Sequence, residues 1–297
     1  MSRHLGRKGS PVDVDARQWL QPAEAPAEIS RILLHLPESG EAESLIQLAA
    51  ALARRCRARL RGLTVVDTHA LSELVTRESA GYAVSELQRL QIGALRRDEV
   101  RALFSRVCLK ADLDFDLCRK QGRALPLLAA EAQTHDLAIT LGASRGERSG
   151  LSASEAAELL VSGNAPWLVM RPQATLGERV LLVQDETAAA TRAIRSFVRQ
   201  RLFPGATVRL LAVAPTPRDA EAQLHESIEL VRPHFPACEI GYVAGKVTRV
   251  VPEYVRQWEA DLVVVGAHRA PPLARFWSGQ QVAMVLERTS SALYATA

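Results

Sequence analysis

Short apolar runs alternate with amphipathic helical patterns along most of the chain. Residues 32–36 and 180–184 are such runs, and each is followed by apolar residues spaced to line one face of a helix. The runs are apolar throughout rather than at every second position, which is typical of parallel strands covered on both faces. Strands that alternate with helices in this way indicate βαβ units. The pattern therefore predicts a doubly wound α/β fold on a parallel sheet.

The same series of elements occurs twice, and in both copies the third strand ends at a glycine and the fourth is opened by an aspartate. The predicted strands are 32–36, 60–66, 115–122, 136–141 and 167–170 in the first copy, and 180–184, 208–213, 240–245, 261–265 and 293–295 in the second. The predicted helices lie around 45–52, 84–107, 125–129 and 153–161, and around 190–198, 220–231, 247–254 and 282–288. A repeat of this length predicts two copies of one domain rather than two unrelated ones.

The repeat sets the predicted domain boundaries. Residues 1–28 have turn formers and mixed charge without a sustained period, so we interpret them as a flexible tail. The first domain is then 29–172 and the second 173–297. A pseudo-twofold pairing of the two domains would bring the last strands, 167–170 and 293–295, close to the dyad and shield their edges.

Composition narrows the class of protein. The chain has 297 residues, 47% hydrophobic and 24% charged, which is typical of a globular protein and excludes a disordered or collagen-like chain. The net charge of +4 is small, and bases alternate with acids, as in residues 96–99, so we predict no nucleic-acid binding. No apolar run approaches the about 20 residues of a membrane helix, and no signal-peptide core follows the charged start. We expect a cytoplasmic protein without a membrane segment.

Cysteine and histidine positions give no metal signature. Cys56, Cys108, Cys118 and Cys238 form no CxxC pair, and no His/Cys/Asp cluster has ligand spacing. We therefore predict no metal site, and the scattered thiols fit a reducing compartment.

Ligands of open α/β sheets bind beyond the carboxyl ends of the strands, so binding motifs are expected in the loops there. The dinucleotide pattern GxGxxG and the P-loop pattern GxxxxGK[ST] are both absent. In the second copy, the first strand ends at Asp185. The fourth strand ends at Gly266, and thirteen residues later Gly279 precedes the next helix.

The strand order, the glycine after the third strand, the Asp-Leu-Val-Val-Val-Gly strand at 261–266 and the late Gly279 together resemble the universal stress protein family. The chain resembles a tandem member over about residues 29–297. The resemblance implies two flavodoxin-like domains, similar in fold to adenine nucleotide hydrolases, that pair through their last strands. In nucleotide-binding members of the family, ATP lies across the strand ends.

The resemblance also implies which residues of the second domain would hold an adenine nucleotide. Asp185 would face the adenine end, and glycines at 266 and 279 would let the backbone approach phosphate near a helix N-terminus. Arg269 and Gln280 depart from the family pattern, which has Gly and Ser or Thr there. Arg269 could grip a phosphate or fill the pocket and exclude ribose. The full set of expected site residues is Val183, Asp185, Val213, Val265, Gly266, Arg269, Gly279 and Gln280.

The first domain departs further from the family pattern. Pro37 and Glu38 stand where the second domain has its aspartate, and Ser154 and Glu155 stand where the late glycine is expected. A carboxylate near a helix start repels phosphate, so we predict that this domain binds no nucleotide.

Two other segments invite sharper interpretations. Residues 39–44 faintly resemble the Ser-Gly-Gly-x-Asp-Ser loop of ATP pyrophosphatases, but Glu41 and Glu43 replace its second Gly and its Asp. We interpret them instead as a helix start with Ser39 as N-cap. The amphipathic stretch 86–107 could dock a partner, although such a stripe more often covers the sheet.

The function expected from these features is a non-enzymatic stress-response or signalling protein, with ATP or another adenine nucleotide bound in the second domain. An alternative is an interaction or scaffold protein in which both sites have decayed. A nucleotide-hydrolysing enzyme would need Mg²⁺ and a base near the phosphates, for which only His268, Glu38 and Glu43 are candidates. The sequence identifies no protein partner and leaves pairing between chains open.

Overall fold

A computed structural model describes residues 29–37, 41–66, 80–143, 150–163, 165–172, 174, 177–267 and 279–297, with the side chains of helix α3 described from residue 93 onward. The predicted tail 1–28 lies outside the described residues, and so do Glu38, Ser39, His268 and Arg269.

The described elements alternate between strand and helix as predicted. The first half contains β1 (Arg31–His35), α1 (Ala42–Cys56), β2 (Arg59–Val66), α3 (Ala80–Lys110), β3 (Phe115–Gln121), α4 (Ala124–Ala132), β4 (Leu137–Leu141), α5 (Ala153–Ser162) and β5 (Trp167–Met170). The second half contains β6 (Arg179–Gln184), α6 (Ala188–Gln200), β7 (Thr207–Ala214), α7 (Pro217–Val231), β8 (Glu239–Ala244), α8 (Val247–Trp258), β9 (Leu262–Gly266), α9 (Gln280–Arg288) and β10 (Ala292–Thr296).

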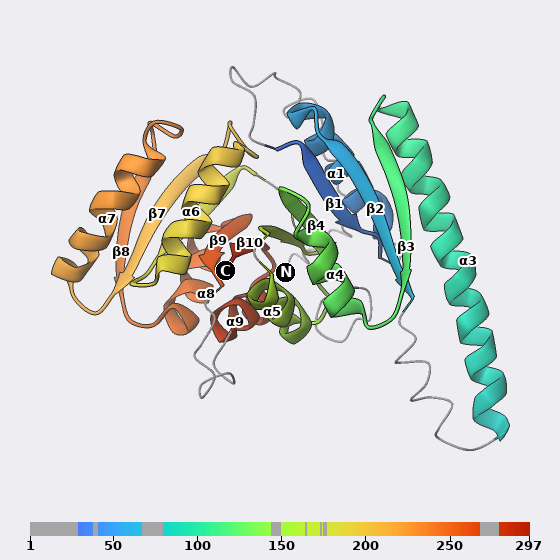
Figure 1. Ribbon diagram of the computed structural model, residues 1–297. Coiled ribbons are helices and arrows are strands. Elements are labelled where there is room, and N and C mark those ends of the chain that lie inside the picture. Colours follow the sequence, from blue (N-terminus) through green and yellow to red (C-terminus); the bar gives the residue numbers. More distant parts are fainter. Residues whose placement is uncertain are drawn as a thin grey trace, which may run out of the picture.

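The ten strands of the described residues form one sheet in the order β3-β2-β1-β4-β5-β10-β9-β6-β7-β8. The strands pair in parallel within each half, and the central pair β5–β10 is antiparallel, with Tyr294 opposite Leu168. The order is therefore the same outward from the centre on both sides, with β3 and β8 at the two ends (Figure 1). This pairing confirms the prediction that the two last strands meet at a pseudo-twofold axis.

Helices cover both faces of the sheet and bury two core layers. The layer that contains residues of α1, α3, α6 and α7 runs through both halves, and so does the layer on the side of α4, α5, α8 and α9. Trp167 of β5 and Tyr294 of β10 are the largest fully buried side chains, and they point into opposite layers at the seam. Burial of both faces explains why the central strands β4, β5, β9 and β10 are buried at every residue, whereas the end strands β3 and β8 are half-exposed and contain charged residues.

Two aspartates clamp equivalent strand starts in the two halves. The Oδ2 atom of Asp136 accepts hydrogen bonds from the backbone N–H groups of Ser30 (2.8 Å) and Arg31 (2.9 Å). The Oδ2 atom of Asp261 accepts in the same way from the N–H groups of residues 178 and 179, at 3.0 and 2.7 Å. The aspartate that opens the fourth strand in each copy thus holds the amino end of the neighbouring first strand.

The structure corrects the predicted start of α1. The helix begins after Glu41, which stands at the N-cap position without a side-chain cap, so the prediction of Ser39 as N-cap was wrong. Burial of Ala42 and Leu45 against the sheet sets the start of the helix instead of a capping side chain. Helix α3 is also longer than the predicted 84–107, and it extends well past the end of β3 (Figure 1).

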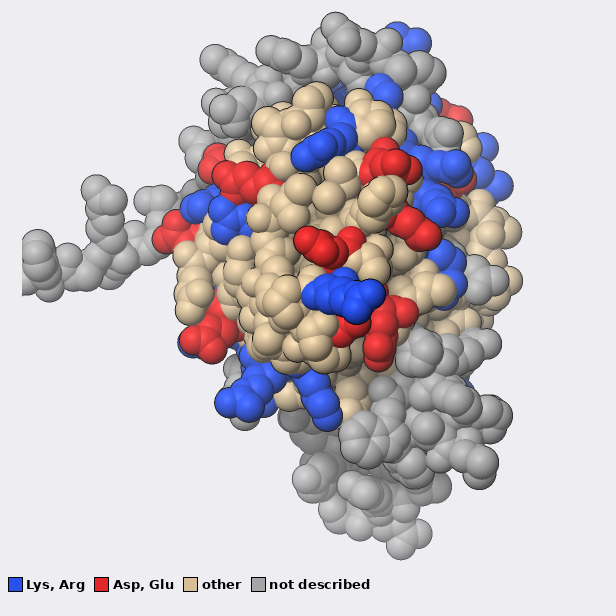
Figure 2. All heavy atoms as spheres, turned by 90° about the vertical axis from the view of Figure 1, so that its left-hand side faces the viewer, with Lys and Arg blue, Asp and Glu red and all other residues tan. Residues whose placement is uncertain are grey.

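Charges are mixed on the surface near the β8 edge. Figure 2 shows lysine and arginine side chains interspersed with aspartate and glutamate over this face. Among the described residues, every helix is too short or too polar to cross a bilayer.

Candidate functional site

The carboxyl ends of β9, β6 and β7 lie side by side and bring together five of the expected site residues. In the sheet register, Leu182 lies opposite Val264, so the next residues, Val183 and Val265, are also neighbours. Val183, Val213 and Val265 belong to one core layer and are buried. They can form only the floor of a site, with Asp185 and Gly266 above them at the strand ends.

Asp185 is 8% exposed and is held at the start of α6. Its Oδ1 atom accepts hydrogen bonds from the backbone N–H (2.9 Å) and the hydroxyl (2.5 Å) of Thr187, the N-cap residue of the helix. The neighbouring Gln184 side chain donates to the carbonyl oxygen of Asp185 at 2.7 Å and accepts from the Ser227 hydroxyl of α7 at 2.8 Å. These bonds fix the backbone of the loop and the direction of the carboxylate.

Gly266 has a packing role that is independent of any ligand. A Cβ atom at this position would lie 2.4 Å from the backbone carbon of Ala189 and 2.4 Å from the backbone nitrogen of Ala190. The end of β9 therefore lies directly against the first turn of α6, and only glycine fits there. In the first half, Leu141 occupies the corresponding register position.

Gly279 is the N-cap residue of α9 and contacts the other half. Its φ of +74° lies in the left-handed region that favours glycine. An added Cβ would lie 3.1 Å from the Cβ of Ala157 and 3.2 Å from Cγ2 of Val161, both in α5. Gln280 is the first residue of the helix and is exposed. The late glycine of the expected motif thus lies at the seam between the halves.

Helix α5, the equivalent of α9 in the first half, has a glutamate in its first turn. Ser152 is the N-cap of α5, and its hydroxyl accepts from the backbone N–H of Glu155 at 3.2 Å. The Glu155 carboxylate in turn accepts from the Ser152 backbone N–H at 2.8 Å, which completes a capping box. The expected obstacle to phosphate in the first half is therefore built into the helix start, whereas the first turn of α9 contains no acidic residue.

In the first half, polar residues occupy the strand-end positions that are valines in the second half. His35 and Thr140 occupy the register positions of Val183 and Val265, and the His35 Nδ1 atom lies 3.0 Å from the Thr140 hydroxyl. Burial lowers the pKa of His35 to about 4, so the ring is neutral near pH 7. His35 is therefore a neutral histidine at the strand end, in hydrogen-bond contact with Thr140.

The other candidates are not gathered at one site. Glu43 lies on the exposed side of α1, where its carboxylate accepts from Gln47 at 3.2 Å. Glu38, His268 and Arg269 lie outside the described residues. Within the described part of the chain, no group of three His, Cys, Asp or Glu side chains could hold a metal ion.

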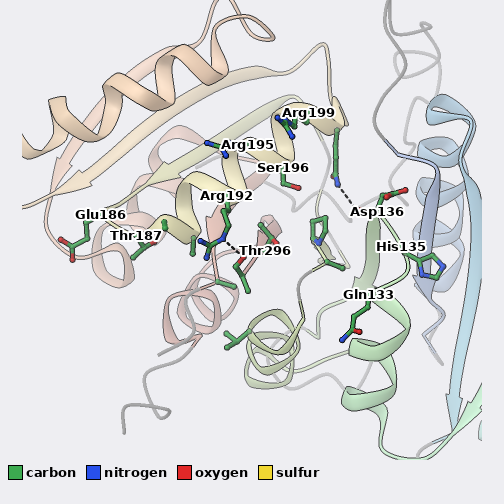
Figure 3. A pocket seen from close by; sticks show the side chains of 18 residues that line it. Gln133, His135, Asp136, Glu186, Thr187, Arg192, Arg195, Ser196, Arg199 and Thr296 are labelled. Atoms are coloured by element: carbon green, nitrogen blue, oxygen red, sulfur yellow. Dashed lines mark hydrogen bonds between the residues drawn. The ribbon is translucent and has the colours of Figure 1, made fainter. Parts of the chain in front are cut away.

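A large cleft that the sequence did not reveal lies beside these residues, between the two halves (Figure 3). One wall is α6, from which Arg192, Arg195 and Arg199 reach the cleft. The opposite wall contains His135 and Asp136 of the α4–β4 turn. The cleft has a volume of about 1430 Å³. Thr187 and Ala267, which also line it, adjoin the strand ends described above. The spacing of the three arginines along one helix face was a visible signal, but the facing wall depends on the fold.

Comparison with known proteins supports this fold. Residues 177–293 match the model of the Universal stress protein family. The whole fold is similar to that of a universal stress protein from Archaeoglobus fulgidus, with a TM-score of 0.66, 15% identity, and coverage of 91% of this chain and 98% of that one. A functionally unknown protein from Pseudomonas aeruginosa gives a TM-score of 0.55 at 15% identity, over 91% of this chain and 92% of that one. No curated protein sequence matches the chain significantly.

The chain therefore has a doubly wound α/β fold, and its residues 177–293 match the Universal stress protein family. The family match does not extend over the first half, whose elements follow the same order.

Proposed function

We propose that this chain is a non-enzymatic stress-response protein with two universal-stress-type domains, residues 29–172 and 173–297, of which the second binds an adenine nucleotide. The family match over 177–293 supports the assignment of the second domain. The repeated element order and the β5–β10 pairing support the same assignment for the first.

The observation that carries the nucleotide proposal is the contrast between the starts of α9 and α5. Both helices precede a last strand, and they pack against each other across the seam, with Gly279 next to Ala157 and Val161 of α5. Helix α5 has Glu155 bonded within its first turn, whereas α9 follows Gly279, which has no side chain, and has no acid in its first turn. A helix N-terminus of the second kind attracts phosphate because its first N–H groups and its dipole face the anion.

In this proposal, Asp185 faces the adenine end, and Val183, Val213 and Val265 form the floor. Gly266 and Gly279 stand at the two ends of the loop that would lie next to the phosphates. Arg269 and Gln280 replace the smaller residues of the family pattern in this region. Arg269 either binds phosphate or fills the site.

Equilibrium dialysis of the full chain with ATP and AMP tests the proposal. We expect saturable binding that weakens about tenfold or more in Asp185→Asn, because loss of one charged hydrogen bond costs about 1.5–3 kcal/mol. The side-chain amide oxygen of this variant can still accept from Thr187, so the helix start is retained. The matched control is Glu186→Gln, which removes the same charge from the exposed neighbouring residue. Absence of binding at millimolar nucleotide would refute the nucleotide part.

A second candidate, an interaction protein with decayed sites, is favoured by one observation. Packing requires Gly266, and the left-handed φ of Gly279 favours glycine, so their presence alone does not need a ligand. The double change Arg269→Gly with Gln280→Ser separates the two candidates. If the parent chain binds nothing and the double variant binds ATP, Arg269 fills the site and the interaction role is preferred. ATP turnover above background by the parent chain would instead revive the enzymatic alternative.

A further inference from the structure

The cleft between the halves has a smaller counterpart on the other side of the pseudo-twofold axis. The large cleft is lined by His135 and Asp136, and the small one by the equivalent residues Ala260 and Asp261. The volumes differ, at about 1430 and 320 Å³. The small cleft is also lined by Ala174, from the segment that joins the halves, and this residue packs against the core layer that contains α1.

The chain enters both halves in the same way. Asp261 binds the N–H groups of residues 178–179, immediately after the joining segment, and Asp136 binds those of Ser30 and Arg31. Because these clamps are equivalent, Ile29 and Ser30 enter the first half at the place where residues 177 and 178 enter the second. The described part of the chain begins at Ile29, which is buried beside this clamp.

The wall formed by α6 is positively charged. Arg192, Arg195 and Arg199 are all exposed, and the Arg192 guanidinium donates to the carbonyl oxygen of Ala297 at 3.0 Å. Within the described ranges, no carboxylate pairs with Arg195 or Arg199. Asp136, an acid of the opposite wall, is already bonded to residues 30 and 31.

The segment that precedes Ile29 is complementary to this wall in charge and long enough to lie along it. In residues 18–28 the only charged side chains are Glu24 and Glu28, and Pro22 and Pro26 favour an extended chain. In an extended polyproline-like conformation, four residues span about 12 Å. Four helical residues, the separation of Arg195 and Arg199, span about 6 Å. Because glutamate and arginine have long side chains, which can lean toward each other along the helix, Glu24 and Glu28 can contact Arg195 and Arg199 together.

We propose that the cleft between α6 and the α4–β4 turn is a docking site for residues 18–28 of the same chain, held by Glu24 and Glu28 against Arg195 and Arg199. The occupant is the counterpart of the joining segment that lines the smaller cleft. The proposal does not depend on nucleotide binding.

Disulfide trapping in the full chain tests the proposal. Ala25→Cys is combined with Gln133→Cys, which is exposed at the cleft wall, in a background with Cys118→Ser and Cys238→Ser. Oxidation of a dilute sample is followed by mass spectrometry and non-reducing electrophoresis. We expect a rapid intramolecular disulfide, and a rate at least about tenfold lower after Arg195→Glu with Arg199→Glu, since that change replaces attraction by repulsion at short range.

Two further variants separate charge pairing from simple proximity. Glu24→Lys with Glu28→Lys, added to the α6 reversal, should restore the rate. The control reversal Arg218→Glu with Arg232→Glu makes the same charge change at exposed positions of and just after α7 and should leave the rate unchanged. Equal rates in the parent and the α6 reversal would overturn the proposal. A disulfide-linked dimer as the main product would overturn docking within one chain and assign the segment to a second copy.

Discussion

The side-chain amide of Gln200, the last residue of α6, donates a hydrogen bond of 2.8 Å to the backbone carbonyl of Asp136 in the other half. The Gln200 oxygen accepts from the hydroxyl of Tyr294 at 2.9 Å, and that hydroxyl also lies 2.8 Å from Ser196. Tyr294 is fully buried. A closed polar network therefore crosses the apolar seam between the halves.

Gln200→Ala should destabilise the protein by about 1–3 kcal/mol, because it leaves the Tyr294 hydroxyl and the Asp136 carbonyl without this partner in a buried place. Urea unfolding measures the change. Gln47→Ala is the control, since Gln47 bonds only to exposed Glu43 in α1 and should cost less than about 0.5 kcal/mol. Equal effects of the two changes would mean that the network adds nothing to stability.

The pair His35 and Thr140 should make stability depend on pH. The pKa of His35 is lowered to about 4 in the folded chain, against about 6.5 when unfolded, so the unfolded state binds an extra proton between these values. The contribution of His35 to the free energy of unfolding is therefore fully present above about pH 6.5, and it is lost as the pH falls toward 4. Between pH 7 and pH 5 the loss should be about 1–2 kcal/mol.

The double change His35→Val with Thr140→Val copies the valine pair of the second half and should remove this part of the pH dependence. Other histidines, such as His135, titrate in both proteins, so the readout is the difference between parent and variant in urea midpoints at pH 7 and pH 5. A variant with the same pH dependence as the parent would contradict the assignment to His35.

Gly266→Ala should destabilise the chain in the absence of any ligand. The new methyl group would lie 2.4 Å from backbone atoms of α6, and overpacking of this kind costs about 1–3 kcal/mol. Gly205→Ala is the matched control, because an added Cβ there meets nothing within 4 Å. Thermal unfolding of both variants decides the point. A Gly266→Ala protein as stable as Gly205→Ala would show that packing does not require the glycine.

Asp136→Asn should weaken the clamp on β1 and reduce acid sensitivity. Burial acts to raise the pKa of Asp136, but hydrogen bonds from Ser30 and Arg31 outweigh it and lower the pKa below its ordinary value. The carboxylate therefore stabilises the fold above about pH 4, and this contribution is lost as the pH falls through the folded pKa.

At pH 7 the free energy of unfolding of the Asp136→Asn variant should be about 1–2 kcal/mol lower than that of the parent. This difference should become smaller toward pH 3. Asp114→Asn is the control, because Asp114 is exposed and only distantly paired with Arg59. Urea unfolding at both pH values is the measurement. If the difference in unfolding free energy between parent and variant is the same at pH 7 and pH 3, the Asp136 clamp is not the source of that difference.

Much of the fold could be predicted because the central strands are almost continuously apolar and most helices have an apolar face of regular period. The predicted strands 167–170 and 293–295 meet at the seam as expected. The helix starts were less predictable, and α1 begins at Ala42 rather than after Ser39 because burial, not a cap, decides its first turn. The gathering of Asp185 and Gly266 at adjacent strand ends followed from the parallel order alone.

By itself, the sequence determined the element order, the duplication, the unequal strand-end residues of the two copies and the acid at the start of 153–161, because each is a local pattern of residue types. Only the tertiary structure decided that Gly266 and Gly279 are packing positions, that Asp136 and Asp261 clamp neighbouring strands, and that Gln200 joins the halves. These relationships link residues far apart in the chain, for example 64 positions between Gln200 and Asp136. Contacts of that kind depend on how the strands order in the sheet, and residue periodicity carries no information about them.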